Sequence, residues 1–529
     1  MVPSVVTRAA VCRSPIRPWF SINGDAFIKS LLSPGGRTPD RPDGGRDVRG
    51  SLVQPTQKGP VGPAERVRQS HWWCRALHPS FHCPTVAVPC REGKGAGMRS
   101  MMSWASVFRL RQYAKSSLWI APLFGMALGV VLAELAIAAD GVDWPPSGWR
   151  YSATTASGVL SAIVGAMVAL LGFVVTIGVL VIQQATGALS PRYMRLWYRD
   201  RLQKTVLATF TGTFAFAFSL LRSIESNSVP DFGVTLAGAA VAVSLLLLLV
   251  YLNRFTHNLR PVAIADLVGR MGEGVFARGA MEVGASAPHD GESVTAHGPV
   301  TLIRSPHGGA IQAFDVAGLV AAGVGHDCTF VVPHLIGDYV PPGAVLVEVH
   351  GGTSAPDPRH VTGLIALGAE RTIEQDPAFA LRILVDIAIR ALSPAVNDPT
   401  TAVQVLNHIE SFLTVIGSAR LRDRYVMTDD RDRPRLVLHG RDWEDYLQLA
   451  VSEIRDYGAT STQICRRLRA LLDGLLESLL AVQHPAVETQ LKLLDQSVER
   501  AFPDPDRRAV AQWTDRQGIG GRSRPHRWG

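Results

Sequence analysis

Four long apolar runs separated by short polar loops dominate the pattern of the chain between residues 117 and 255. Each run is nearly free of charge and is close to the ~20 residues that a helix needs to cross a bilayer core. The runs cover residues 117–139, 157–183, 205–221 and 234–252. A buried helix of a soluble protein can also be apolar on all sides, but four such runs in succession favour an α-helical membrane domain of four transmembrane helices.

The basic residues near these runs predict the orientation of the domain. Arginines and lysines cluster before the first run, between the second and third, and after the fourth. The other two loops, DGVDWPPSGWR and ESNSVPDF, carry acids and a single arginine. Because basic segments beside a membrane helix stay on the cytoplasmic side, we expect both termini, and the whole region after Arg260, to lie in the cytoplasm.

Residues 1–97 form a leader rich in Arg, Pro and Gly that shows no periodicity able to build a core. We expect it to be disordered, and it lacks the apolar stretch of a signal peptide. An alternative is that the leader is not translated in the native protein, since Met98, Met101 or Met102 could start a chain just before the first membrane run. The transmembrane domain is then expected over residues 98–260.

The net charge indicates the kind of partner, and the cysteine positions indicate whether disulfides are expected. The net charge of +8 is partly carried by both tails and suits anionic lipid headgroups, so we do not interpret it as nucleic-acid binding. Four of the six cysteines lie in the leader, which leaves Cys328 and Cys465 far apart in sequence. No disulfide framework is predicted.

A cytosolic β-rich module is expected over residues 261–355. Short strands with turns follow one another from TLIRS to GDYVPPGAVLVEV, with one small-residue helix between them. The last stretch resembles biotinyl and lipoyl carrier modules, but no lysine occupies the turn, so a structural module is the better interpretation. His326, Cys328 and His334 would share a face of an unbroken strand, but they would span about 27 Å, too far for one metal ion. We predict no metal and no cofactor.

A cytosolic helical domain is expected over residues 356–503, followed by a disordered basic tail over 504–529, so that the fold class of the cytosolic part is α+β. In AFALRILVDIAIRAL, Arg382, Asp386 and Arg390 stand four residues apart on one helix face, so Asp386 can pair with an arginine on either side. The helix should end near Leu392 because of the following proline. Asp398 should cap the next helix.

Two long motifs connect the chain with a known family. VLVIQQATGALSPRYMRLWYRDRLQKTVLATFTGTFAFAF occurs first and RTIEQDPAFALRILVDIAIRALSPAVNDPTTA follows it. The sequence from about Met101 to Phe502 resembles the bacterial membrane-protein family called domain of unknown function 2254. The resemblance implies a bacterial inner-membrane protein with a cytosolic C-terminal domain. It implies no reaction.

The polar loop RALSPAVNDPTTA is the candidate ligand site. Its simplest interpretation is a joint in which Ser393 ends one helix and Asp398 starts another. As an alternative, its polar side chains would gather at a helix N-terminus, which is a natural place for an anion. The candidate residues are Arg390, Ser393, Asn397, Asp398, Thr400 and Thr401, with Arg382 and Asp386 as a supporting ion pair.

The second membrane run carries small residues at alternating steps of four and three: Gly158, Ala162, Gly165, Ala169 and Gly172. Such a face lets another helix backbone approach closely, either within the bundle or across a homo-oligomer; lining a pore is the alternative. Glu134, an acid within the first run, is a functional candidate, although a position at the membrane surface is favoured.

Three classes of function remain open, since no nucleophile elbow, P-loop, zinc-protease motif or dinucleotide fingerprint is present. A membrane-anchored sensory or scaffolding protein needs only what the sequence shows. A channel or transporter would need the small-residue helix to line a path, and an enzyme would need the SPAVNDP loop to bind a substrate. We favour the first class, with the channel or transporter as the alternative. The expected partner is the lipid bilayer, together with a further copy of the chain.

Overall fold

The computed structural model describes residues 103–139, 150–188, 199–225, 228–258, 260–284, 300–419 and 421–520. They belong to one compact unit that spans residues 96–529. The leader, residues 1–97, lies outside the described residues.

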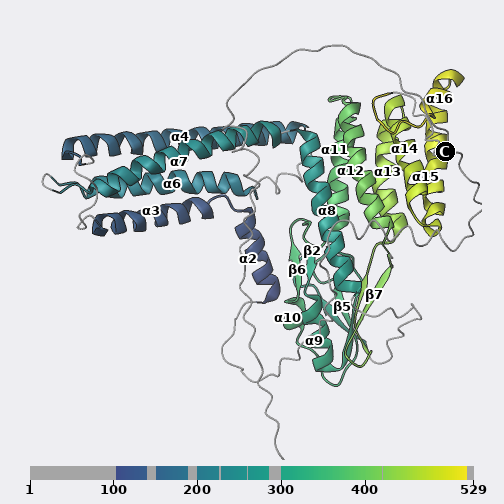
Figure 1. Ribbon diagram of the computed structural model, residues 1–529. Helices are drawn as coiled ribbons and strands as arrows, with labels where there is room; N and C mark the ends of the chain where they lie inside the picture. The colour runs from purple at the N-terminus through teal and green to yellow at the C-terminus, as the bar shows by residue number, and fades with distance from the viewer. Residues whose placement is uncertain are drawn as a thin grey trace, which may run out of the picture. The chain divides into compact units, whose positions relative to one another are not determined.

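Four helices of the N-terminal region are long and apolar enough to cross a membrane, within the part of the chain that the structure describes. They are α3 (Ile120–Ala139), α4 (Ala153–Ala188), α6 (Arg201–Arg222) and α7 (Asp231–Asn258). They run side by side as a bundle (Figure 1). A shorter helix, α2 (Trp104–Ser116), precedes them. The four apolar runs of the sequence therefore form four helices, as predicted.

The closest helix contact in the bundle joins α3 and α6 through glycines that the sequence analysis did not single out. A Cβ atom on Gly125 would lie 2.1 Å from the carbonyl oxygen of Ala208, and one on Gly129 would lie 2.2 Å from that of Gly212. Thr211 adds a hydrogen bond from its hydroxyl to the Pro122 carbonyl, at 3.0 Å. Small residues at four-residue spacing thus let two backbones meet, which is how membrane helices gain packing energy without a hydrophobic driving force.

The small-residue face of α4 is exposed. Its opposite face packs into the bundle through Ala156, Leu160, Ile163 and Met167. A Cβ atom built on Gly158, Gly165 or Gly172 meets nothing within 4 Å. Packing within the bundle therefore does not explain these glycines, and contact with a second copy stays a proposal.

The region after residue 260 contains a helical layer around one large core. Its helices are α8 (Pro261–Gly284), α11 (Pro377–Ala391), α12 (Pro399–Gly417), α13 (Trp443–Gly458), α14 (Thr462–Ser478), α15 (His484–Ala501) and α16 (Pro505–Ala511), with a short 3-10 turn at Ala481–Gln483. Fully buried Leu, Ile and Phe side chains at helical spacing, such as Leu406, Ile409 and Phe412, form the core. As predicted, α11 ends just before Leu392 and Asp398 caps α12.

Two small sheets make the mixed α/β part of this region. The strands are β1 (Val300–Arg304), β2 (Gly309–Phe314), β3 (Cys328–Val332), β4 (Tyr339–Val340), β5 (Val345–Gly351), β6 (Ile365–Gly368), β7 (Arg424–Thr428) and β8 (Pro434–His439). One sheet has the order β1-β5-β3-β8-β7 and the other β4-β2-β6. All pairs are antiparallel except β3 with β8. The short helices α9 (Val316–His326) and α10 (Pro358–Thr362) also belong to this mixed α/β part.

The structure differs from the expected domain limits at three places. Residues 261–284 form α8, which packs on α11 and α12 and not with the strands, because its apolar residues recur at helical spacing. The two sheets continue past residue 355, since β6 belongs to the three-stranded sheet and β7 and β8 belong to the five-stranded sheet. The tail is ordered as far as residue 520: α16 lies within it, and buried Asp515 accepts the backbone amides of Gly518 and Gly520.

Leucine substitutions can separate packing within one chain from packing between chains. Gly129→Leu should prevent the α3–α6 contact and lower the thermal stability strongly, since overpacking a close contact costs about 1–3 kcal/mol or more. Gly165→Leu should leave the stability of the single chain unchanged and alter only the size of the oligomer. The measurements are unfolding temperature and particle mass in detergent.

Val130→Leu, at a position of α3 that is 41% exposed, is the matched control and should resemble the unchanged protein. If Gly165→Leu lowered the unfolding temperature of a monomer as much as Gly129→Leu, the exposed face assigned to α4 would be wrong.

Candidate functional site

The segment from Arg371 to Asp376 joins β6 to α11. Hydrogen bonds to β2 hold it near both of its ends. Gln375 exchanges two of them with the Phe314 backbone, because Phe314 N donates to its Oε1 at 2.9 Å and its Nε2 donates to the Phe314 oxygen at 3.2 Å. Gln312 Nε2 donates to the Glu370 oxygen at 2.8 Å. The segment therefore lies along β2, although it forms no strand of its own.

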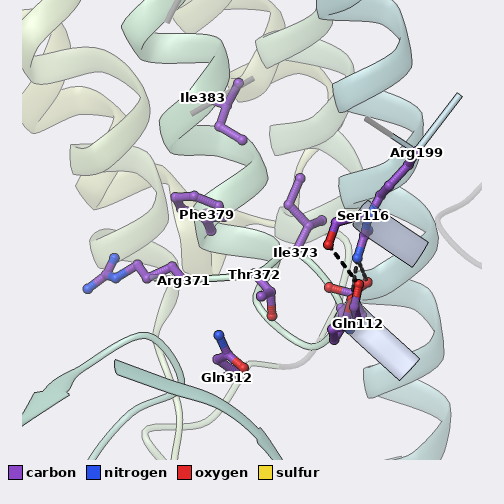
Figure 2. A pocket seen from close by; sticks show the side chains of 10 residues that line it. Gln112, Ser116, Arg199, Gln312, Arg371, Thr372, Ile373, Phe379 and Ile383 are labelled. Carbon is purple, nitrogen blue, oxygen red and sulfur yellow. Dashed lines mark hydrogen bonds and ion pairs between the residues drawn. The ribbon is translucent and has the colours of Figure 1, made fainter. Parts of the chain in front are cut away.

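A cavity of about 70 Å³ opens beside this segment. Residues from α2, the start of α6, β2, the segment itself and α11 line it: Gln112, Ser116, Arg199, Gln312, Arg371, Thr372, Ile373, Glu374, Phe379 and Ile383. Figure 2 shows the Arg199 and Gln112 side chains meeting at one end, with Phe379 and Ile383 of α11 on another side. Four stretches that are distant in sequence thus meet at one small hollow lined by both polar and apolar side chains.

Arg199 and Glu374 form an ion pair at the edge of the cavity. Their side chains are 24% and 19% exposed, and the same Arg199 nitrogen also donates to Gln112 Oε1. Burial alone would raise the pKa of Glu374, but the Arg199 charge and the hydrogen bond with Gln112 outweigh it and hold that pKa below its usual value. Glu374 is therefore ionised at neutral pH, and its ion pair with Arg199 connects the chain just before α6 to the segment before α11.

Three buried oxygens of the segment have no hydrogen-bond partner among the described residues. They belong to alternate positions: Thr372 Oγ1, Glu374 Oε2 and Asp376 Oδ2. A buried polar atom without a partner costs about 1–3 kcal/mol, so three in five residues mark an unusual stretch. The cavity is large enough for about two water molecules, and water or a small polar solute there could satisfy the Thr372 and Glu374 atoms.

Asp376 is the most strongly perturbed acid of the segment. It is 2% exposed and caps α11, since its Oδ1 accepts the Phe379 amide at 3.1 Å. Burial raises the pKa of Asp376 to about 6, although the Phe379 amide and the charges of Arg441 and Arg371 act in the opposite direction. The Asp376 charge also acts on Tyr446: burial first and this charge second raise the pKa of the Tyr446 phenol.

The candidate loop between α11 and α12 uses several of its polar side chains for capping. Asp398 accepts the Thr401 amide at 3.0 Å and the Thr401 hydroxyl at 2.6 Å, and Ser393 Oγ donates to the Arg390 oxygen at 2.7 Å. Asn397 has a left-handed backbone with φ of 48°. Thr400 lies apart from these contacts, in a surface hollow beside the start of α14. The ligand role of this loop stays a prediction.

The supporting pair lies on α11. Arg382 Nε is 2.8 Å from Asp386 Oδ1, and Arg382 also forms a two-pronged ion pair with Glu453 of α13. These contacts join two helices of the core, so a structural role accounts for them.

The remaining candidates lie apart from one another. His326 Nδ1 lies 2.8 Å from Ser354 Oγ, and His334 Nε2 lies 2.7 Å from the Val345 oxygen, while Cys328 is buried. Within the described ranges, no group of three His, Cys, Asp or Glu residues could hold a metal ion. Glu134 is exposed on α3.

Sequence reasoning missed the role of Arg199 and of the 371–376 segment. The stretch RTIEQDP belongs to one of the two motifs that indicated the family. Ile373 is its one large apolar residue, and so polar a stretch is typical of a surface loop. The available signal was the density of polar residues immediately before a strongly apolar helix. Which of them are buried depends on α2 and on Arg199, more than 170 residues away in sequence.

A family model described as predicted membrane protein (DUF2254) matches residues 115–474 of the chain. The protein belongs to this family. It is similar to uncharacterized protein Rv1290c of Mycobacterium tuberculosis and to uncharacterized protein Mb1321c of Mycobacterium bovis, each 29% identical over 417 residues that cover 75% of this chain and 79% of the relative. No solved structure matches it. The family resemblance expected from the two motifs is confirmed.

The buried acid of the segment predicts a pH dependence of stability. Because the pKa of Asp376 is raised to about 6 from 3.8, the folded state binds a proton more tightly than the unfolded chain does. The contribution of Asp376 to the free energy of unfolding should therefore be highest below about pH 4 and fall as pH rises to about 6, by at most about 3 kcal/mol. Asp376→Asn keeps the Phe379 cap and removes the ionisation, so it should be more stable than the unchanged protein at pH 7 but not at pH 4.

Unfolding temperatures between pH 4 and pH 8 measure this effect. Asp504→Asn changes an exposed aspartate that caps α16 and should run parallel to the unchanged protein. A parallel curve for Asp376→Asn as well would show that Asp376 does not titrate in this window.

Substitutions at Asp398 test whether the loop is only a joint. Asp398→Ala should lower the free energy of unfolding by about 1 kcal/mol, whereas Asp398→Asn should change it little, since both Asp and Asn cap helices well. Inorganic phosphate should not alter the unfolding temperature. A phosphate-dependent rise that Arg390→Gln abolishes would instead establish the anion site.

Proposed function

We propose that this protein is a membrane-anchored sensory protein, in which a change in the membrane bundle is passed to the helices after residue 260 through the contact between Arg199 and Glu374. That contact carries the proposal. Arg199 lies two residues before α6, and Glu374 lies three residues before α11. A shift of α6 would therefore act on the start of the most buried helix of the large core.

A second connection supports the same function. Helix α7 ends at Asn258 and α8 begins at Pro261. Along α8, Gly272 lets the helix approach α11 and α12 so closely that a Cβ atom would lie 2.6 Å from the Phe412 ring and 2.8 Å from Ala380. Both α6 and α7 are thus connected by short segments to the same helical core. If the helices of this core have two discrete arrangements, a shift of α6 or α7 would favour one of them.

A channel or transporter with a regulatory domain is the alternative function. It requires the small-residue face of α4 to line a path. Since that face is exposed in the single chain, a path along it would need a second copy. Ion flux into liposomes that contain the purified protein tests this alternative, and the sensory function expects no flux above empty liposomes.

The location and assembly of the protein belong to the same proposal. We infer the bacterial inner membrane, with both termini in the cytoplasm, from the basic segments that flank the bundle. We infer a homo-oligomer from the exposed glycines of α4. Scaffolding, in which the helices after residue 260 only hold a partner at the membrane, needs the anchor but not the Arg199–Glu374 contact.

Hydrogen exchange tests the coupling directly. In lipid nanodiscs of two bilayer thicknesses, amide exchange in peptides that cover residues 371–391 should differ severalfold for the unchanged protein. Glu374→Gln keeps the size of the side chain but removes its charge and the ion pair with Arg199. This variant should show the same exchange in both bilayers.

Arg270→Gln is the matched control, because it breaks the surface ion pair between Arg270 and Asp266 on α8. It should keep the response to thickness. A response that persists in Glu374→Gln would mean that the signal does not pass through this contact, and no response in any protein would favour scaffolding.

A further inference from the structure

Helix α2 uses one face to hold the candidate site. The Ala105 amide donates to the Gly363 oxygen at 2.9 Å, and Ala105 packs with Ala313 and Ala366 of the small sheet. Further along the same face, Gln112 and Ser116 line the cavity. These successive positions are seven and four residues apart, so they form one stripe of the helix.

The opposite face of α2 is apolar and exposed. Val107, Leu110 and Tyr113 are 48%, 56% and 53% exposed, and Ala114 lies between them on the helix surface. At 3.6 residues per turn, Val107, Leu110 and Ala114 point away from Ala105 and Gln112, and Tyr113 lies at one side of this stripe. A 13-residue helix thus has a partner on one side and an unpartnered apolar stripe on the other.

Basic side chains flank this stripe on both edges. On a helix of 3.6 residues per turn, Arg111 and Lys115 lie along one edge and Arg109 along the other; all three are exposed. Partial burial lowers the pKa of Lys115, and although Glu374 acts in the opposite direction, Arg111 and Arg199 lower it further. The cluster therefore holds cations close together, and an external anion would stabilise them.

The end of α2 lies beside the membrane-spanning helices. Ser117 is extended, with ψ of 131°, and α3 begins at Ile120, so that α2 does not continue the direction of α3 (Figure 1). The Lys204 ammonium of α6 donates to the Lys115 oxygen. Trp119 Nε1 donates to the Tyr113 hydroxyl at 3.1 Å, which places two aromatic rings of the type found at membrane surfaces next to the first spanning helix.

We propose that the exposed face of α2 binds the surface of the bilayer, with Val107, Leu110 and Tyr113 among the acyl chains below the headgroups and the flanking basic residues on anionic phospholipid headgroups. An apolar stripe edged by Arg and Lys is the pattern of helices that lie in the membrane interface. A second copy is the less suitable occupant, since twofold pairing would bring the same cations of both chains together.

The inference deepens the proposed function and rests on it for its consequence. If α2 lies on the lipid surface, the composition of that surface acts on Gln112, which shares Arg199 with Glu374. Anionic lipid is then the species that the protein senses. Lipid contact at α2 is measured separately from exchange at residues 371–391, so failure of the contact and failure of the coupling are distinguishable.

Photocrosslinking identifies the occupant. The full chain carries a benzophenone amino acid at Leu110 and is placed in nanodiscs of phosphatidylcholine with about 30% phosphatidylglycerol bearing a clickable acyl chain. We expect a lipid adduct at Leu110 that is at least severalfold stronger than at Val324, a 46% exposed residue of α9. Replacing both Arg111 and Lys115 by Gln should lower the yield of the lipid adduct several-fold, up to about fivefold for each charge removed. In discs whose clickable lipid is phosphatidylcholine alone, the same replacement should change the yield little.

Four results would overturn the inference. A cross-link to a second chain would make this face an oligomer contact, and a cross-link within the chain would show that another segment covers it. An adduct no stronger than at Val324 would mean that the face lies in water. An adduct of equal strength after removal of the Arg111 and Lys115 charges would exclude recognition of anionic headgroups.

Discussion

The ion pair between Arg199 and Glu374 is the contact on which the arrangement of the site depends. Both side chains are largely shielded from water, so loss of either partner would leave a charge in a poorly solvated place, which costs more than the pair itself contributes. Gln112 binds the same guanidinium. Three parts of the chain must therefore come together: the end of α2, Arg199 just before α6, and the segment before α11.

That requirement explains why polar groups accumulate between two well-packed cores. The helical core and the sheet core are each closed by Leu, Ile, Val and Phe side chains, and the chain crosses from one to the other through residues 371–376. A crossing segment without strand partners must satisfy its polar groups through side chains, as Gln375 and Gln312 do. One side-chain oxygen each of Thr372, Glu374 and Asp376 stays without a hydrogen-bond partner among the described residues, which lowers the stability of this segment.

Periodicity predicted the elements better than their grouping. Apolar runs of about 20 residues and the proline and Asp398 signals around α12 are local, so they identified the spanning helices and the joint. The parallel pairing of β3 with β8 and the packing of α8 on α11 are decided by contacts over 100 residues apart, which no local pattern contains. The site was missed for the same reason, because Glu374 is an ordinary loop residue until Arg199 and Gln112 cover it. The exposed glycines of α4 likewise required the neighbouring helices to be known.

Helix α2 connects the membrane surface with the candidate site because it is short and rigid. Thirteen residues make a rod of about 20 Å, and a rod cannot move its lipid-facing side without moving Ala105, Gln112 and Ser116 on the other. The small sheet fixes its first turn through the hydrogen bond to Gly363, whereas Lys204 and Arg199 fix its last turn. A change at the membrane surface therefore acts near the last turn, where Gln112 and Glu374 share Arg199. It reaches there the buried segment before α11, in which three oxygens have no hydrogen-bond partner among the described residues.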